Sequence, residues 1–248
     1  MLPAIYSKKA KDRFYEKNDL IHGNIAKALL LFVLPLIAGS LIQQLYTTAD
    51  AIIVGQFTGK NGLAAIDSVH TLFKFPINFM NGLAAGATII ISRYFGAKDK
   101  KSLYCAVHTA LLTAVLLGII CTLCGVYFTP RLLDIMSVPT DIYHDAQIYC
   151  QIYFSGLWAM ILYNMTAGIL RAFGDSKRPL YVLILSSIIN IAGDFLLVGV
   201  FSTGVWGAAA ATVLSQVISA FVVYGILKKS DFIEKKSAYL IMESAASI

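Results

Sequence analysis

The stretch SSIINIAGDFLL, residues 186–197, places a carboxylate inside an apolar segment, residues 179–201, that is long enough to cross a lipid bilayer. Ser186, Asn190 and Asp194 recur every fourth residue, so a helix would present them as one polar stripe. An ionised Asp at the centre of a membrane helix costs about 2.5–3.5 kcal/mol on insertion scales. We therefore expect Asp194 to face the interior of a helix bundle in a functional site. The structural alternative is a hydrogen bond that only joins two helices.

The composition indicates an integral membrane protein. The chain has 248 residues, of which 58% are hydrophobic and 14% charged, whereas soluble domains carry about 25% charged residues. Apolar segments of spanning length can be drawn at six places: 27–54, 63–91, 103–128, 146–169, 180–201 and 205–227. The sequence thus predicts an all-α bundle of six transmembrane helices in the cell membrane.

The positive charge of the chain follows this topology. The formal net charge is +6, and 17 of the 20 Lys and Arg residues fall on one side when the six helices alternate in direction. Basic residues collect on the cytoplasmic side of membrane proteins, so both termini are expected there. We expect residues 1–26 and 229–248 to be cytoplasmic extensions of a six-helix unit, residues 27–228. The basic side would attract anionic lipid, and nucleic-acid binding is not expected.

A second polar face lies in the first predicted helix. Gln43, Tyr46, Thr47 and Asp50 share one side of that helix. Four polar side chains on one face of a membrane helix indicate a water-filled cavity rather than contact with lipid. Pro35, closer to the start of the helix, removes a backbone hydrogen bond and favours a kink, which is either a static bend or a hinge.

Other chemistries lack their signatures in this sequence. Cys121 and Cys124 form a CxxC motif, but they fall in a predicted membrane helix without neighbouring His or charged residues, which favours packing over metal binding or redox work. The chain contains no HExxH motif, no GxSxG motif and no paired catalytic Asp motif. We therefore expect no enzymatic activity.

Several short motifs occur in a fixed order across residues 27–228. They are Leu34-Pro35 followed by TADAIIVG (48–55), Gly82-x3-Gly86 followed by ISRYFGA (91–97), Arg171-x2-Gly174-Asp175-x3-Pro179, Asn190-x3-Asp194, and Gly204-x2-Gly207-Ala208-Ala209-x2-Thr212. This ordered set resembles the multidrug and toxic compound extrusion (MATE) family of cation-coupled exporters. Members of the family have two six-helix lobes, and this chain resembles the N-terminal lobe alone. The resemblance therefore implies either a truncated fragment or a chain that associates with a second lobe or a second copy of itself.

The resemblance implies an antiporter that exports drugs or other cationic or amphipathic small molecules in exchange for H⁺ or Na⁺. Asp50 and Asp194 would be the titrating pair, with Asn190, Tyr46 and Thr212 as their hydrogen-bonding shell. Further residues would line the cavity or permit bending of the first helix: Gln43, Thr47, Asn164 and Ser186 for the cavity, and Pro35 for the hinge. No cofactor is implied, and no metal other than Na⁺ at the coupling site.

Two alternatives stay open on the sequence. A lipid or polysaccharide flippase shares the many-helix architecture, but its cavity would suit lipid-linked phosphates with many basic residues. Lys74 is the only base that we expect to be buried, whereas the buried acids favour a cationic cargo. A non-transporting assembly partner or fragment is the second alternative, because one lobe forms only half of a transport cavity.

Overall fold

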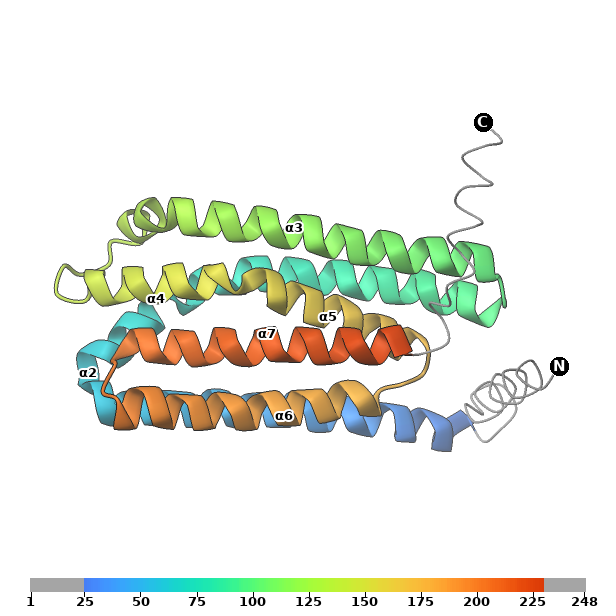
Figure 1. The fold of residues 1–248 in the computed structure, drawn as a ribbon, viewed down its shortest axis with the longest axis horizontal. Helices are drawn as coiled ribbons and strands as arrows, with labels where there is room; N and C mark the ends of the chain where they lie inside the picture. Colours follow the sequence, from blue (N-terminus) through green and yellow to red (C-terminus); the bar gives the residue numbers. More distant parts are fainter. Residues whose placement is uncertain (1–24, 230–248) are drawn as a thin grey trace.

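The helices lie side by side and alternate in direction, so apolar segments can cross a bilayer repeatedly with their backbone groups paired inside each helix (Figure 1). The computed structural model describes residues 25–229. Most of the two expected cytoplasmic extensions, residues 1–24 and 230–248, lies outside the described residues. The first described helix begins and the last one ends at the same end of the bundle, as an even number of crossings requires (Figure 1).

Two of the expected spans are joined end to end in α2 (Ile25–Gly96). The helical backbone is interrupted at Gly59, where φ is 72° and ψ is −170°. Glycine reaches this region without the steric cost that a Cβ brings. The chain reverses direction here, so the two halves of α2 correspond to the predicted spans 27–54 and 63–91 (Figure 1).

The third span is α3 (Lys100–Ile135), whose start is set by Asp99. The Asp99 carboxylate accepts a hydrogen bond from the backbone N–H of Ser102 at 3.2 Å. Such an N-cap satisfies one of the amide groups that the first helical turn leaves unpaired. Hydrogen bonds from the side chain and backbone of Ser102 also hold the pKa of the Asp99 carboxyl below its ordinary value.

The fourth span is bent, in contrast to the single helix expected over residues 146–169. It consists of α4 (Tyr143–Ser155) and α5 (Leu157–Ala172), which meet at 43°. At the junction Gly156 lies so close to Val213 of the last helix that a Cβ would come within 2.5 Å of the valine Cγ2. The predicted span 146–169 is therefore present as two helices, and the chain bends where a missing side chain permits close contact with its neighbour.

The last two spans are α6 (Lys177–Asp194), continued by the π-helical segment η1 (Phe195–Val200), and α7 (Val205–Lys229). They pack closely, since a Cβ on Gly193 would lie 3.0 Å from the Cβ of Ala211. Small residues allow helix backbones to approach in a membrane. The α7 residues of this kind that are buried include Gly207, Ala208, Ala209 and Ala211.

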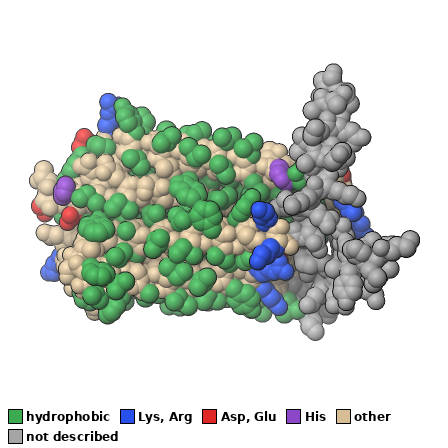
Figure 2. Space-filling view, viewed as in Figure 1, with side chains coloured by type: hydrophobic (Ala, Val, Ile, Leu, Met, Phe, Trp, Pro, Cys, Tyr) green, Lys and Arg blue, Asp and Glu red, His purple; other side chains and the backbone are tan. Residues whose placement is uncertain are grey.

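Large apolar side chains cover the flanks of the bundle, and charged side chains gather at its two ends (Figure 2). Leu45 and Ile89 are each 69% exposed and Phe75 is 79% exposed, which suits contact with lipid tails rather than water. Four described helices are long and apolar enough to span a membrane, or five when α4 and α5 count as one span. Because α2 contains two spans, the structure confirms the all-helical bundle of six transmembrane segments.

Candidate functional site

The structure brings together the two carboxylates that the sequence places on separate helices. Asp50 lies in the first half of α2 and Asp194 is the last residue of α6, and their carboxyl groups come within hydrogen-bonding reach of each other. Asp194 is fully buried. Oδ1 of Asp50 and both carboxyl oxygens of Asp194 are shielded from solvent, and they accept no hydrogen bond from any other group of residues 25–229. An ionised carboxylate only accepts hydrogen bonds, so the pair can be satisfied by one shared proton or by a cation between the two groups.

The members of the polar stripe of α6 have different partners. Asn190, one turn before Asp194, donates from Nδ2 to Thr212 Oγ1 at 3.2 Å. Its Oδ1 is buried and accepts no hydrogen bond within the described part of the chain. Ser186, a further turn away, donates to the backbone carbonyl of Ser215 at 3.3 Å. The same stripe therefore ties two helices together at Ser186 and presents unpaired oxygen atoms at Asn190 and Asp194.

Three tyrosines lie around the carboxyl pair, and the sequence pattern identified only one of them. Tyr46 is one turn before Asp50 on α2 and close enough to both carboxylates to interact electrostatically. Tyr149 and Tyr153 of α4 also lie near Asp50. Phe73, from the second half of α2, packs against these two rings at centroid distances of 6.1 and 4.1 Å. In the sequence, Tyr149 and Tyr153 are four residues apart in a predicted membrane helix and therefore share one face of it. This spacing does not identify the helix that the two tyrosines face.

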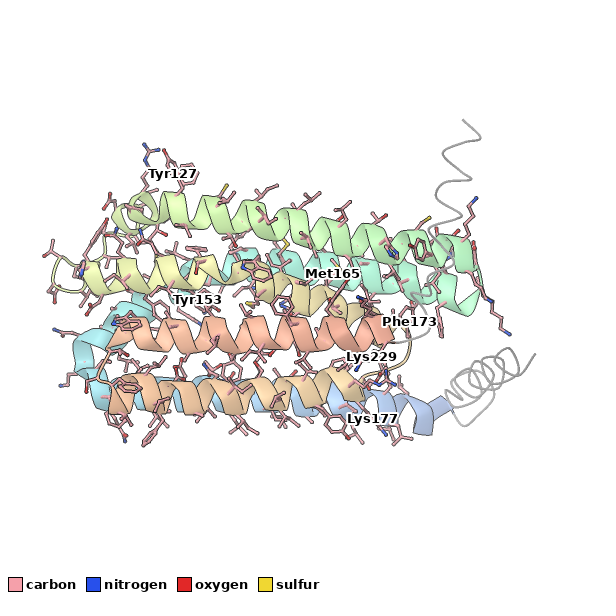
Figure 3. All side chains as sticks on the ribbon, in the orientation of Figure 1. Tyr127, Tyr153, Met165, Phe173, Lys177 and Lys229 are labelled. Atoms are coloured by element: carbon pink, nitrogen blue, oxygen red, sulfur yellow. The ribbon has the colours of Figure 1, made fainter. Side chains whose placement is uncertain are left out.

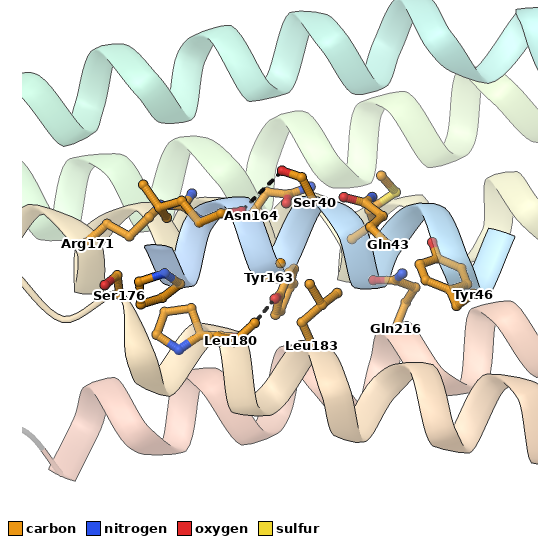
Figure 4. A pocket seen from close by; sticks show the side chains of 15 residues that line it. Ser40, Gln43, Tyr46, Tyr163, Asn164, Arg171, Ser176, Leu180, Leu183 and Gln216 are labelled. Carbon is orange, nitrogen blue, oxygen red and sulfur yellow. Dashed lines mark hydrogen bonds between the residues drawn. The ribbon is translucent and has the colours of Figure 1, made fainter. Parts of the chain in front are cut away.

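A separate polar pocket of about 200 Å³ lies between α2, α5, α6 and α7 (Figure 4). Four of the predicted residues line it: Pro35, Gln43, Tyr46 and Asn164. Thr47 and Ser186 do not line it, and Thr47 is exposed and donates to the backbone carbonyl of Gln43 at 2.9 Å. Tyr46 connects the two features, because it lines the pocket and also lies beside Asp50.

The oxygen atoms at the carboxyl pair suit a proton or a hard monovalent cation rather than a transition metal. Within residues 25–229 there is no group of three or more His, Cys, Asp and Glu side chains that could hold a metal ion. Carboxylate and amide oxygens are ligands of hard cations, whereas thiolate and imidazole select softer metals. Two carboxylates and the unpaired Asn190 Oδ1 provide the first kind of ligand.

The structure is thus a six-helix membrane bundle with an apolar exterior and two facing carboxyl groups in its interior. A family profile described as MatE matches residues 35–196. The chain belongs to the multidrug and toxic compound extrusion family, whose members are transporters and not enzymes.

Relatives and solved structures agree with this assignment. The chain is 33% identical over 210 residues to the "Probable multidrug resistance protein YoeA" of Bacillus subtilis, covering 83% of this chain and 45% of that protein. It is 24% identical over 229 residues to the "Multidrug export protein MepA" of Staphylococcus saprophyticus, covering 92% of this chain and 49% of that protein. A crystal structure of MATE in the bent conformation superposes with a TM-score of 0.81 at 27% identity, covering 89% of this chain and 50% of that one. The chain spans about half the length of the relatives it matches.

Proposed function

We propose that this chain is one lobe of a cation-coupled antiporter for cationic or amphipathic small molecules, and that the Asp50–Asp194 pair binds the coupling ion. The observation that carries the proposal is the facing arrangement of the buried Asp194 carboxyl group and the half-buried Asp50 carboxyl group. Oδ1 of Asp50 and both carboxyl oxygens of Asp194 are shielded from solvent and accept no hydrogen bond from another group within residues 25–229. The names of relatives, which include multidrug resistance and multidrug export proteins, support the class of cargo.

Ion binding at this pair would change the contact between two helices. Two unit negative charges about 4 Å apart repel by about 4 kcal/mol at an effective dielectric constant of 20. One proton or one Na⁺ between the groups removes that repulsion and joins α2 to α6. Release of the ion restores the repulsion and loosens the same contact. A lobe with two such states can be biased by the ion gradient across the membrane.

Asn190 and Thr212 would complete the ion site. Because Thr212 accepts from Asn190 Nδ2, the amide is oriented and its Oδ1 stays available as a third oxygen ligand. Tyr46 would join the site to the polar pocket. Pro35, in the wall of that pocket, would let the first half of α2 bend as the ion binds.

We further propose that both termini are cytoplasmic and that a second lobe or a second copy of the chain forms the opposite wall of the transport cavity. Alternating access in repeat-built transporters is a motion of one half against the other around a central site. The end of the bundle near Gly59 would then face the outside.

The ion-binding step can be tested on the purified chain without transport. Infrared difference spectra recorded on adding H⁺ or Na⁺ should show a change in the carboxyl C=O stretching band, and Asp50→Asn and Asp194→Asn should each remove it. Asp141→Asn is the matched control, because Asp141 is exposed and lies outside the helices. A wild-type chain without any carboxyl response to either ion, or a loss of the band in Asp141→Asn alone, would contradict the proposal.

A further inference from the structure

The polar pocket has two unlike ends. Tyr46 and Gln216 lie at one end, and Arg171 and Ser176 lie at the other (Figure 4). The first end adjoins the carboxyl pair through Tyr46. The second end has a guanidinium group and no carboxylate in its lining. One end of the pocket thus adjoins the carboxyl pair through Tyr46, and the other end carries a positive charge.

Arg171 is half-buried and turned toward the pocket rather than extended into solvent (Figure 4). Within residues 25–229 no carboxylate pairs with its guanidinium, and no protein acceptor takes a hydrogen bond from it. By contrast, Arg178, on the first turn of α6, pairs with Asp175 at 3.1 Å. A guanidinium group carries five N–H donors, and removing it partly from water without acceptors is costly. Arg171 therefore lacks the kind of partner that the neighbouring arginine has.

The surroundings of Arg171 favour a negatively charged guest. Lys177 begins α6 and Lys229 ends α7, and both lie at the Arg171 end of the bundle (Figure 3). Asp175, the acid in the turn between Arg171 and α6, is already paired with Arg178. Basic groups gathered at one end of the bundle raise the local concentration of anions there.

We propose that the Arg171 end of the pocket binds an oxyanion, either the phosphate of a lipid headgroup or the carboxylate of an amphipathic small molecule. The planar fork of arginine matches both groups through two parallel hydrogen bonds. Ser176 and Asn164 can donate to the remaining lone pairs of the guest. A volume of about 200 Å³ is below the 300–1,000 Å³ typical of drug-sized sites, so the pocket accepts a headgroup or one end of a molecule.

This inference goes beyond the proposed ion coupling and needs neither a gradient nor a second lobe. The test is isothermal titration of the purified chain in a non-ionic detergent with four probes: dihexanoyl-phosphatidylglycerol, hexanoate, inorganic phosphate, and dihexanoylglycerol as the probe without an oxyanion. Arg171→Gln should weaken binding of the oxyanionic probes about 10- to 100-fold, because charge-assisted hydrogen bonds are lost. Arg171→Lys keeps the charge but not the fork, so it should give an intermediate loss. Circular dichroism confirms that each variant keeps its helical content.

Arg178→Gln is the matched control, because Arg178 is basic, close in sequence and outside the pocket. Its affinities should stay within about twofold of wild type, because Arg178 is itself exposed and lies outside the pocket. Binding of the phospholipid alone assigns the site to a headgroup, and binding of hexanoate or phosphate assigns it to a free or cargo-borne oxyanion. Absence of binding for all oxyanionic probes, wild-type affinity in Arg171→Gln, or an equal loss in Arg178→Gln overturns the proposal. Measuring the same affinities in Asp194→Asn separates this site from the coupling pair, since that variant should bind the probes normally.

Discussion

Variants of the hydrogen bond between Asn190 and Thr212 can distinguish a role of Asn190 in ion binding from a role in helix packing alone. Thr212→Val keeps the shape of the side chain and removes the acceptor of Asn190 Nδ2. Since Asn190 is 2% exposed, its amide would then be buried without a partner, which costs about 1–3 kcal/mol of stability. Replacing both partners by apolar residues, in Asn190→Leu with Thr212→Val, leaves no unpaired polar group and should recover most of that loss.

The measurement is unfolding of the purified chain in mixed micelles, combined with the infrared carboxyl response to H⁺ and Na⁺. We expect the double variant to lose about 1–2 kcal/mol less free energy of unfolding than the losses of the two single variants added together. It should nevertheless have lost its Na⁺ response, because the third oxygen ligand is gone. Ser186→Ala is the matched control on the same stripe. It removes one hydrogen bond to the Ser215 carbonyl, so it should cost about 1 kcal/mol and leave the response to both ions unchanged. A double variant with a normal Na⁺ response would show that Asn190 only joins helices. A Ser186→Ala variant without the response would refute the assignment of helix joining to Ser186 and ion binding to Asn190 and Asp194.

Three further outcomes are expected. Gly156→Leu should destabilise the bundle by about 1–3 kcal/mol by overpacking, because even a Cβ would lie 2.5 Å from Val213. In mixed-micelle unfolding, combining it with Val213→Ala should recover part of the lost stability, whereas wild-type stability of Gly156→Leu would contradict the close contact. Single cysteines at Lys60 and Lys98, in a background without the native cysteines, should react with a membrane-impermeant reagent from opposite sides of the membrane, and labelling of both from one side would disprove the proposed topology. The purified 248-residue chain should not export dye from vesicles at protein-to-lipid ratios too low for dimers, because one lobe forms half of the cavity wall. Under those conditions, gradient-driven efflux that disappears in Asp194→Asn would show that one lobe suffices.

The amino-acid sequence by itself determined the membrane class, the number of crossings and the polar stripes. These properties are local: length and composition define a spanning segment, and a helical period defines which side chains share a face. For that reason the spacing of Ser186, Asn190 and Asp194 is enough to place them on one stripe. The ordered motifs likewise sufficed to recognise the family, which the profile match over residues 35–196 confirms.

The tertiary structure decided which face meets which. Periodicity does not identify the partner of a stripe, so only packing could show that Ser186 is bonded to α7 while Asp194 faces Asp50. For the same reason the sequence could not predict that Tyr149 and Tyr153 lie near the carboxyl pair.

Backbone breaks were also decided in three dimensions. The bend at Gly156 depends on a contact with Val213, 57 positions further along the chain. The Arg171 pocket also depends on tertiary packing, because it lies between α5, α6 and α7 and the first half of α2, which is far from the other three in sequence. Local sequence sets the preference of each segment, but the shape of a cavity depends on the side chains of all the segments that surround it.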